Sequence, residues 1–257
     1  MISIDRVSVS FGGLRAVDDV SFDIPAGRIT GLIGPNGAGK TTMFNAIAGH
    51  VPVSAGHIRL EGDDITRLQP HQRAAKGLAR TFQIPQEFAR LTVLENFMAA
   101  AATPIGENVF NVVFRRSRFM AEEEAIYRAA LDTVAFLELE RVTDEKAGNL
   151  SGGQKKLLEL GRALMRNPKI ILLDEIGAGI NRTLLAKISD KIKLLNRERG
   201  LTFCLIEHDL DYVSKLCDDV VVMAQGKLLM RGSVDQVRQD ERVIEAYFGG
   251  GKYEAQA

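Results

Sequence analysis

Short apolar runs alternate along the chain with longer segments of helical periodicity. The predicted strands are residues 2–9, 17–24, 28–33, 56–60, 170–173 and 202–207, and the predicted helices are residues 40–49 and 183–197. Residues 220–224 and 227–231 predict a hairpin across Gln225 and Gly226. Alternation of this kind is typical of an α/β domain built around a largely parallel sheet.

The pattern changes between residues 90 and 148. Residues 91–102 are apolar and alanine-rich, and residues 119–137 predict a helix with an acidic, solvent-facing side. No strand is predicted in this stretch. We therefore expect one domain over residues 2–248, in which an α/β core (2–89 and 149–248) carries an inserted helical subdomain (90–148). Residues 249–257 are the predicted C-terminal tail.

Composition narrows the class of protein. Lys plus Arg is 33 and Asp plus Glu is 33, so the formal charge is zero and no nucleic-acid partner is expected. Cys204 and Cys217 form no metal-binding pattern, and Cys204 in its apolar run is expected to be a reduced core residue. No apolar stretch approaches the ~18 residues of a membrane span, and the first residues lack a signal-peptide pattern.

A glycine-rich loop between a predicted strand and a predicted helix carries the first candidate chemistry. Residues 34–41 read GPNGAGKT, which matches the phosphate-binding pattern G-x-x-x-x-G-K-[ST]. The glycines let backbone N–H groups approach an anion, and the positive end of the helix dipole adds to the attraction. We expect Lys40 to reach the β- and γ-phosphates and the Thr41 hydroxyl to bind Mg²⁺. The predicted nucleotide-binding residues of the loop are Asn36, Gly37, Ala38, Gly39, Lys40, Thr41 and Thr42.

Two carboxylates follow the apolar run 170–173. A buried strand that ends in an acid places the acid at the carboxyl edge of the sheet, where ligands bind in open α/β folds. Asp174 is therefore a candidate Mg²⁺ ligand, and Glu175 is placed to take the proton of an attacking water. The pair alone is common, but its occurrence together with the glycine-rich loop favours a nucleotide-hydrolysing site.

A second candidate anion site lies at residues 150–154, which read LSGGQ. Ser151 is a natural N-cap, and two glycines expose backbone N–H groups at the start of a predicted helix. One nucleotide does not need two phosphate sites from one subunit. The pattern therefore predicts that a second subunit's nucleotide is bound, in a head-to-tail dimer, by Ser151, Gly152, Gly153 and Gln154.

Together these motifs resemble those of the nucleotide-binding subunits of ATP-binding-cassette (ABC) transporters, whose diagnostic signature is LSGGQ as it stands here. The resemblance covers about residues 2–248. It implies an α/β fold with a P-loop ATPase core, an antiparallel β edge and an inserted helical subdomain. It also implies an ATPase coupled to transport, with ATP and Mg²⁺ as cofactors.

The resemblance assigns roles to further residues one position at a time. Phe11 stands where an aromatic side chain stacks on adenine, and Val17 where a residue packs near the ribose. Gln83 matches the glutamine that meets Mg²⁺ and the attacking water, and His208 matches the histidine that contacts the γ-phosphate. Residues 178–181 correspond to the loop that crosses the dimer interface.

Residues 78–83, 91–96 and 243–249 resemble the branched-chain amino-acid uptake subfamily, and within it the Liv-G-type ATPase subunit. The resemblance implies a peripheral protein on the cytoplasmic face of a bacterial or archaeal inner membrane. The implied partners are two membrane-spanning permease subunits, a second ATPase subunit or a second copy of this chain, and an external solute-binding protein. Residues 83–96 are the predicted contact with the permeases.

Other cargoes and other classes of nucleotide-binding protein are the alternatives to an amino-acid importer ATPase. Relatives in the subfamily carry urea, amides or aromatic acids, so the cargo stays open. A soluble ABC protein of DNA repair or translation usually has two cassettes or a long coiled-coil insertion, and neither is predicted here. A GTPase or P-loop kinase has no role for LSGGQ, and the guanine-reading Asn-Lys-x-Asp pattern is absent. The one departure from the subfamily is Ile176, which replaces a proline and predicts a looser turn after Glu175.

Overall fold

The computed structural model describes residues 1–81, 87–101 and 116–248. Internal contacts divide the chain into two compact units. The first comprises Met1–Arg80, Lys169–Ile176 and Ile192–Ala257, and the second comprises Thr81–Pro168 and Gly177–Lys191. The second unit thus takes in residues on both sides of β7 in addition to the described part of the helical stretch 90–148.

A six-stranded sheet with the order β10-β9-β3-β8-β7-β6 forms the centre of the first unit. Its strands are β3 (Ile29–Ile33), β6 (Leu78–Arg80), β7 (Ile170–Asp174), β8 (Thr202–Ile206), β9 (Asp219–Ala224) and β10 (Lys227–Gly232). All neighbours pair in parallel except β9 and β10, which form the predicted hairpin. Every residue of β3, β7 and β8 is buried, as continuous apolar runs predict for strands covered on both faces.

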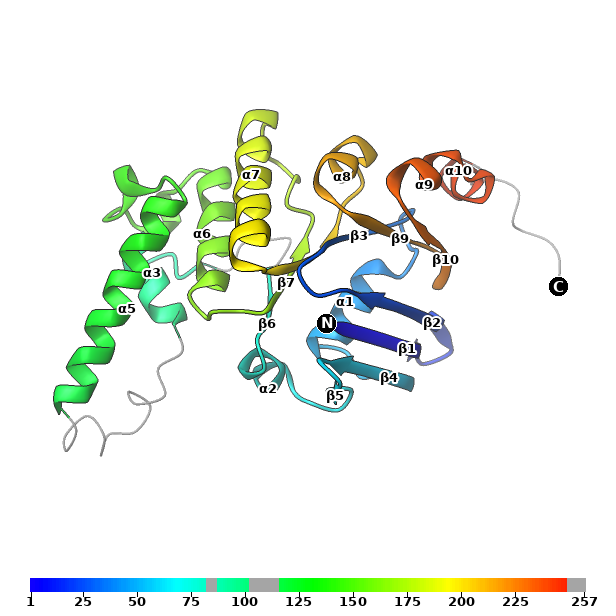
Figure 1. The fold of residues 1–257 in the computed structure, drawn as a ribbon, viewed down its shortest axis with the longest axis horizontal. Coiled ribbons are helices and arrows are strands. Elements are labelled where there is room, and N and C mark those ends of the chain that lie inside the picture. Colours follow the sequence, from blue (N-terminus) through cyan, green and yellow to red (C-terminus); the bar gives the residue numbers. More distant parts are fainter. Residues whose placement is uncertain (82–86, 102–115, 249–257) are drawn as a thin grey trace. The chain divides into compact units, whose positions relative to one another are not determined.

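A second, antiparallel sheet has the order β2-β1-β4-β5. Its strands are β1 (Ile2–Phe11), β2 (Leu14–Ile24), β4 (Ala55–Leu60) and β5 (Asp63–Asp64), and Figure 1 shows β1, β2 and β4 side by side. Buried and exposed residues alternate in the second half of β2, which is typical of a sheet with one wet face. The antiparallel edge expected from the sequence is therefore largely a sheet of its own.

Helix α1 (Lys40–Ala48) packs its apolar side chains into one core cluster with side chains of both sheets. The other helices of the first unit are α2 (Pro70–Ala75), α8 (Leu210–Leu216), α9 (Val234–Gln239) and α10 (Glu241–Phe248). Helix α9 contacts β9, β10 and α10. Helix α7 (Arg182–Arg199) begins in the second unit and ends in the first. No helix in the described ranges has both the length and the apolar character needed to cross a bilayer.

The second unit is helical in its described part. Helices α3 (Val93–Ala100), α5 (Arg116–Phe136) and α6 (Gly152–Leu164) pack against one another. Gly161 of α6 lies directly against Phe97 and Leu137, so a side chain at this position would collide with both. Among the described residues of 90–148 there is no strand, only an isolated bridge between Thr92 and Lys146.

Arg73 of α2 caps the C-terminal end of α1. Helix α1 follows the glycine-rich loop at residues 34–41, which is called the phosphate loop below. Its guanidinium is almost fully buried and donates to the carbonyl oxygens of Ala46 and Ile47, at the end of α1, and of Thr66 and Leu68. Burial lowers the pKa of Arg73 to about 10, which leaves it charged at neutral pH. A cation at the carboxyl end of a helix also complements its dipole. Arg73 thus holds the C-terminal end of α1 in place.

Replacing Arg73 with methionine is expected to lower the free energy of unfolding by about 3 kcal/mol or more, because buried carbonyl oxygens lose their donor. Chemical denaturation with a far-UV circular dichroism readout measures the change. Arg67→Met is the matched control, since Arg67 is exposed on the same segment and should change stability by less than about 0.5 kcal/mol. Equal stability of the two variants would contradict the capping role of Arg73.

Candidate active site

The carboxyl ends of the parallel strands bring the predicted chemistry to one edge of the six-stranded sheet. Leu32 of β3 and Asp174 of β7 both pair with Ile206 of β8, so the segments after these strands leave the sheet at the same level. These segments are the phosphate loop after β3, Glu175 after β7 and His208 after β8. Ligands bind at this edge in open α/β sheets.

Lys40 organises the phosphate loop. Its buried ammonium donates to the carbonyl oxygens of Gly34 at 2.7 Å and Pro35 at 2.9 Å. An ammonium has three N–H donors, so one remains for a phosphate oxygen. Burial lowers the pKa of Lys40, and the negative charges of Glu175 and Asp174 oppose this shift. The lysine therefore sits between the loop and the two carboxylates.

The start of α1 is built to receive an anion. Gly39 precedes the helix with a φ of 93°, and a Cβ atom there would lie 2.6 Å from the carbonyl oxygen of Ala16, so only glycine fits. Helices α3, α6 and α9 begin with the capping side chains of Thr92, Ser151 and Ser233, but α1 has no capping side chain. Its first-turn N–H groups are thus left for a ligand such as phosphate.

A cavity of about 410 Å³ lies beside the phosphate loop. Its lining includes all seven predicted loop residues, Glu175 and His208, and it also includes Leu14, Arg15, Ala16, Gln225 and Gly226. Phe11 and Val17 are not among the lining residues. Phe11 is 50% exposed at the end of β1, whereas the Val17 side chain is fully buried in the core. Gln83 lies outside the described residues.

Glu175 and His208 form a hydrogen-bonded pair at the cavity wall. His208 Nε2 lies 2.8 Å from Glu175 Oε1. Glu175 has a φ of 48°, an unusual value for a residue other than glycine, and its N–H donates to the Ile206 carbonyl at 3.1 Å. The side chain of Ile176, the next residue, is buried. The arrangement presents a carboxylate oriented by an imidazole, which is suited to accept a proton.

Asp174 and Thr41 offer oxygen donors suited to Mg²⁺, which prefers one or two protein oxygens together with phosphate and water. Asp174 is buried, and Arg80 Nη2 donates to its Oδ2 atom at 2.9 Å. Thr41 lines the cavity in the first turn of α1. The described residues contain no group of three or more His, Cys, Asp or Glu placed to hold a metal ion. The oxygen donors of Asp174 and Thr41 fit an Mg²⁺ ion that takes its other ligands from phosphate and water.

The LSGGQ segment begins α6 in the second unit. Ser151 Oγ accepts from the Gln154 N–H at 3.3 Å, and Gln154 Oε1 accepts from the Ser151 N–H at 2.9 Å, a reciprocal capping box. The box leaves the N–H groups of Gly152 and Gly153 at the helix start for an anion. A Cβ atom at Gly152 would meet open space, whereas one at Gly153 would collide with Leu184.

The sequence predicts the Gln225–Gly226 turn, but not that this turn and residues 14–16 line the cavity. The Gly226 N–H donates to the Ala38 carbonyl at 3.1 Å, and the Gly226 carbonyl accepts from the Asp18 N–H at 2.8 Å. The β9–β10 turn therefore holds the phosphate loop against β2. A Gln-Gly dipeptide in the sequence signals a turn, but nothing in it indicates this partner.

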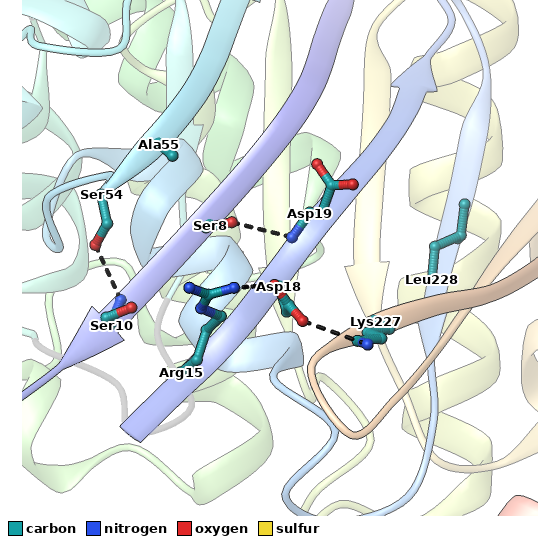
Figure 2. Close-up of a pocket in the computed structure, with 9 residues that line it drawn as sticks. All are labelled: Ser8, Ser10, Arg15, Asp18, Asp19, Ser54, Ala55, Lys227 and Leu228. Atoms are coloured by element: carbon teal, nitrogen blue, oxygen red, sulfur yellow. Dashed lines mark hydrogen bonds and ion pairs between the residues drawn. The ribbon is translucent and has the colours of Figure 1, made fainter. Parts of the chain in front are cut away.

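A second hollow of about 730 Å³ adjoins the same hairpins. Figure 2 shows the Asp18 carboxylate between Arg15, whose Nη1 lies 2.8 Å away, and Lys227, whose Nζ lies 3.4 Å away. The hydrogen bond from Arg15 is the main cause that lowers the pKa of Asp18. Arg15 lines both hollows, and its charge is largely neutralised by Asp18.

The parallel sheet, the lysine-centred phosphate loop and the carboxylates at its edge define a P-loop nucleotide-binding protein. Family models then identify the group within this class. Residues 17–178 match the ABC transporter model, and residues 227–253 match the model described as branched-chain amino acid ATP-binding cassette transporter. The chain belongs to the ABC transporter family of ATP-binding cassettes. These matches confirm the predicted fold class and the resemblance to the branched-chain amino-acid subfamily.

Individual relatives agree with the family assignment. The chain is 39% identical over 97% of its length to the probable branched-chain amino acid transport ATP-binding protein LivG of Archaeoglobus fulgidus, of which 95% is covered. It resembles a nucleotide-free ATP-binding cassette from an ABC transporter at a TM-score of 0.84, with 38% identity and coverage of 97% and 99%. A cassette in the ADP conformation matches at 0.82, with 38% identity and coverage of 97% and 98%.

Proposed function

We propose that this chain is the ATP-hydrolysing subunit of an importer for branched-chain amino acids. The observation that carries the proposal is the Glu175–His208 pair on the wall of the cavity that the phosphate loop also lines. The family match at residues 227–253 supports the choice of cargo. Urea, amides and aromatic acids are the competing cargoes.

Each predicted site residue has its own role in the proposed reaction. The backbone N–H groups of the loop and the Lys40 ammonium bind the phosphates of ATP. Thr41, Asp174 and Gln83 would hold Mg²⁺, which neutralises part of the phosphate charge when bound. Glu175 accepts the proton of the attacking water, and His208 holds the carboxylate in place and contacts the γ-phosphate. From the β1–β2 hairpin, Phe11 stacks on adenine and Val17 supports the ribose site from within the core.

The proposed assembly requires further subunits. Residues 151–154 of a partner close the nucleotide site in a head-to-tail dimer with a second ATPase subunit or a second copy of this chain. Residues 178–181 lie in that interface, where Asn181 Oδ1 already caps α7 by accepting from the Leu184 N–H at 2.9 Å. Two permeases anchor the dimer to the cytoplasmic face of a bacterial or archaeal inner membrane. An external solute-binding protein delivers the cargo.

Transport in proteoliposomes tests the proposal. The chain is reconstituted with the permeases and solute-binding protein encoded beside it, with ATP and Mg²⁺ enclosed and labelled leucine outside. Leucine should accumulate only when this chain and ATP are both present. Accumulation of labelled urea or benzoate instead of leucine would reject the cargo. Absence of ATP hydrolysis by the complete assembly would reject the function as a whole.

The segment 87–96 of the second unit is the described part of the proposed permease contact. Phe88 is 48% exposed, and the Arg162 guanidinium stacks over its ring at 4.6 Å from the centroid. Asn96 is fully buried and fixes the turn: its Nδ2 donates to the carbonyl oxygens of Phe88, Leu91 and Thr92. A rigid turn that presents an exposed aromatic ring is suited to receive a helix of a membrane subunit. Ile84, the other predicted contact, lies outside the described residues.

Replacing Phe88 with glutamate is expected to lower ATP-driven uptake at least tenfold while the basal ATPase rate of the isolated chain stays within twofold. Loss of a buried aromatic contact costs about 2 kcal/mol or more at an interface, and tenfold corresponds to about 1.4 kcal/mol. Leu131→Glu is the matched control, because Leu131 is an exposed apolar residue of the same unit on α5. Equal effects of the two variants on uptake would place the permease contact elsewhere.

A further inference from the structure

Arg80, the last residue of β6, joins two elements of the candidate active site. Its Nη2 atom donates to Asp174 Oδ2 at 2.9 Å, and its Nη1 atom donates to Asn45 Oδ1 at 2.6 Å. The side chains of Arg80 and Asp174 are only 7% and 6% exposed. Strand β6 pairs in parallel with β7, which brings the guanidinium beside the end of β7. The carboxylate proposed for Mg²⁺ is therefore half of a buried ion pair.

Asn45 extends this link to the phosphate-loop helix. Asn45 follows Thr41 by four residues in α1, so the two side chains lie on the same face, one turn apart. Thr41 and Asp174 are two of the proposed Mg²⁺ ligands. The third, Gln83, follows Arg80 by three residues in the sequence. Arg80 thus contacts the elements that carry Asp174 and Thr41.

The chemistry of the guanidinium favours a role in positioning over a role in stability. A buried ion pair is a weak source of stability, because the desolvation of both charges offsets their attraction. A planar guanidinium, however, holds its N–H donors at fixed angles, which a flexible ammonium does not. Two donors on one plane therefore fix Asp174 relative to Asn45. Residues that hydrogen-bond a metal-binding carboxylate from behind orient it and tune its affinity.

We propose that Arg80 is a positioning residue for magnesium, which orients the Asp174 carboxylate and fixes it relative to the helix that carries Thr41. The inference rests on the proposed function, since it assigns Mg²⁺ to Asp174 and Thr41. Arg80 does not line the cavity in which the loop would bind the phosphates. Arg80 should therefore govern how much Mg²⁺ the site needs, and not whether it binds a nucleotide.

Nucleotide binding as a function of Mg²⁺ concentration tests this distinction. The probe is a fluorescent ATP analogue bound to the full chain, titrated with MgCl₂ and, separately, measured in EDTA. Arg80→Gln should raise the half-saturating Mg²⁺ concentration about 10–100-fold. Its affinity for the analogue in EDTA should stay within about twofold of the unmodified chain. Asn45→Ala removes the bond from the guanidinium to α1 but leaves its bond to Asp174 in place, so it should raise the Mg²⁺ requirement less, by about twofold to tenfold.

Two further variants separate positioning from general loosening of the fold. Arg73→Lys perturbs the guanidinium at the other end of α1 and should leave the Mg²⁺ requirement unchanged. Arg80→Lys keeps the charge but loses the planar donors, so it should still raise the requirement. If Arg80→Gln does not fold, Arg80→Lys and Asn45→Ala decide the question.

The possible outcomes are distinct. An unchanged Mg²⁺ requirement in the Arg80 variants would overturn the inference, as would equal losses of affinity with Mg²⁺ and in EDTA. A chain with all residues intact that bound no Mg²⁺-nucleotide would instead overturn the proposed function.

Discussion

Replacing Glu175 with glutamine is expected to lower the ATPase rate roughly 10²–10⁴-fold while ATP binding is retained. The amide keeps the size of the side chain and a hydrogen bond to His208, but it cannot accept the proton of water. Asp174 and Lys40 are untouched, so the phosphates should still bind. Because only hydrolysis removes the γ-phosphate, the variant should accumulate as an ATP-bound head-to-tail dimer. Size-exclusion chromatography should show a dimer with ATP and a monomer with ADP.

A substitution at Gly152 tests whether residues 151–154 of a second subunit close the nucleotide site. A Cβ atom at Gly152 meets open space, and an acid in the first turn of α6 favours the helix dipole, so Gly152→Asp should fold. Its carboxylate would repel the γ-phosphate of the partner's nucleotide. The double variant Glu175→Gln with Gly152→Asp should stay monomeric with ATP. The double variant Glu175→Gln with Gly152→Asn, which adds a neutral side chain of similar size, should dimerise more readily than the variant with the acid.

The chain's natural partner and a surface control complete the experiment. Since the second ATPase subunit can be a different protein, the chromatography is also run with that subunit. Glu245→Gln, an exposed glutamate of α10, should change neither rate nor dimerisation. Normal turnover by Glu175→Gln would assign the base elsewhere, with His208 as the first candidate. A variant that stayed monomeric with both partners would contradict the shared site.

The sequence predicted best those elements whose pattern is local and uninterrupted. Residues 170–173 and 202–207 became β7 and β8, and residues 40–49 became α1, each within one residue at either end. These strands are apolar throughout because both faces are covered, so neighbouring residues suffice to define them. The place of the glycine-rich loop between β3 and α1 was equally predictable, since its glycine and lysine spacing has a direct geometric cause.

Contacts between distant segments could not be read from the sequence. The Gln225–Gly226 turn was recognised, but its hydrogen bond to Ala38 depends on the order of strands in the sheet. Arg80 received no role because its partners, Asn45 and Asp174, belong to other elements. Helices α9 and α10 have only six and eight residues. Such short helices contain too few turns for the helical period of apolar residues to be recognised in the sequence.

Val17 illustrates a different limit. Its position in the sequence indicated a place near the ribose, yet its side chain is fully buried in the core, and Ala16 lines the cavity instead. Successive residues of a strand point to opposite faces, so a shift of one position exchanges core and cavity. The sequence position therefore identifies the hairpin beside the cavity, and the structure shows that Ala16 is the residue of that pair that lines it.

Replacing Lys40 with alanine is expected to abolish measurable ATP turnover and to weaken nucleotide binding about 100-fold or more. The one hydrogen bond that the ammonium can give to a charged phosphate is worth about 1.5–3 kcal/mol, or roughly 10–150-fold, and its attraction for the remaining phosphate charge adds to this. The change also leaves the carbonyl oxygens of Gly34 and Pro35 without their donor, so the loop loses its internal support. Titration with a fluorescent ATP analogue in Mg²⁺ measures the affinity, and release of inorganic phosphate measures the turnover.

Lys227→Ala is the control that separates this contact from a general change of charge near the cavity. Lys227 is an exposed lysine that faces Asp18 at 3.4 Å and follows the Gln225–Gly226 turn of the cavity wall, so its removal alters the local charge by the same amount. Its affinity for the analogue should stay within about twofold. If both variants lost affinity equally, long-range attraction and not the buried ammonium would account for binding. If Lys40→Ala hydrolysed ATP at the unmodified rate, the assignment of residues 34–42 as the phosphate-binding loop would be wrong, because Arg15, the other basic side chain that lines the cavity, is paired with Asp18.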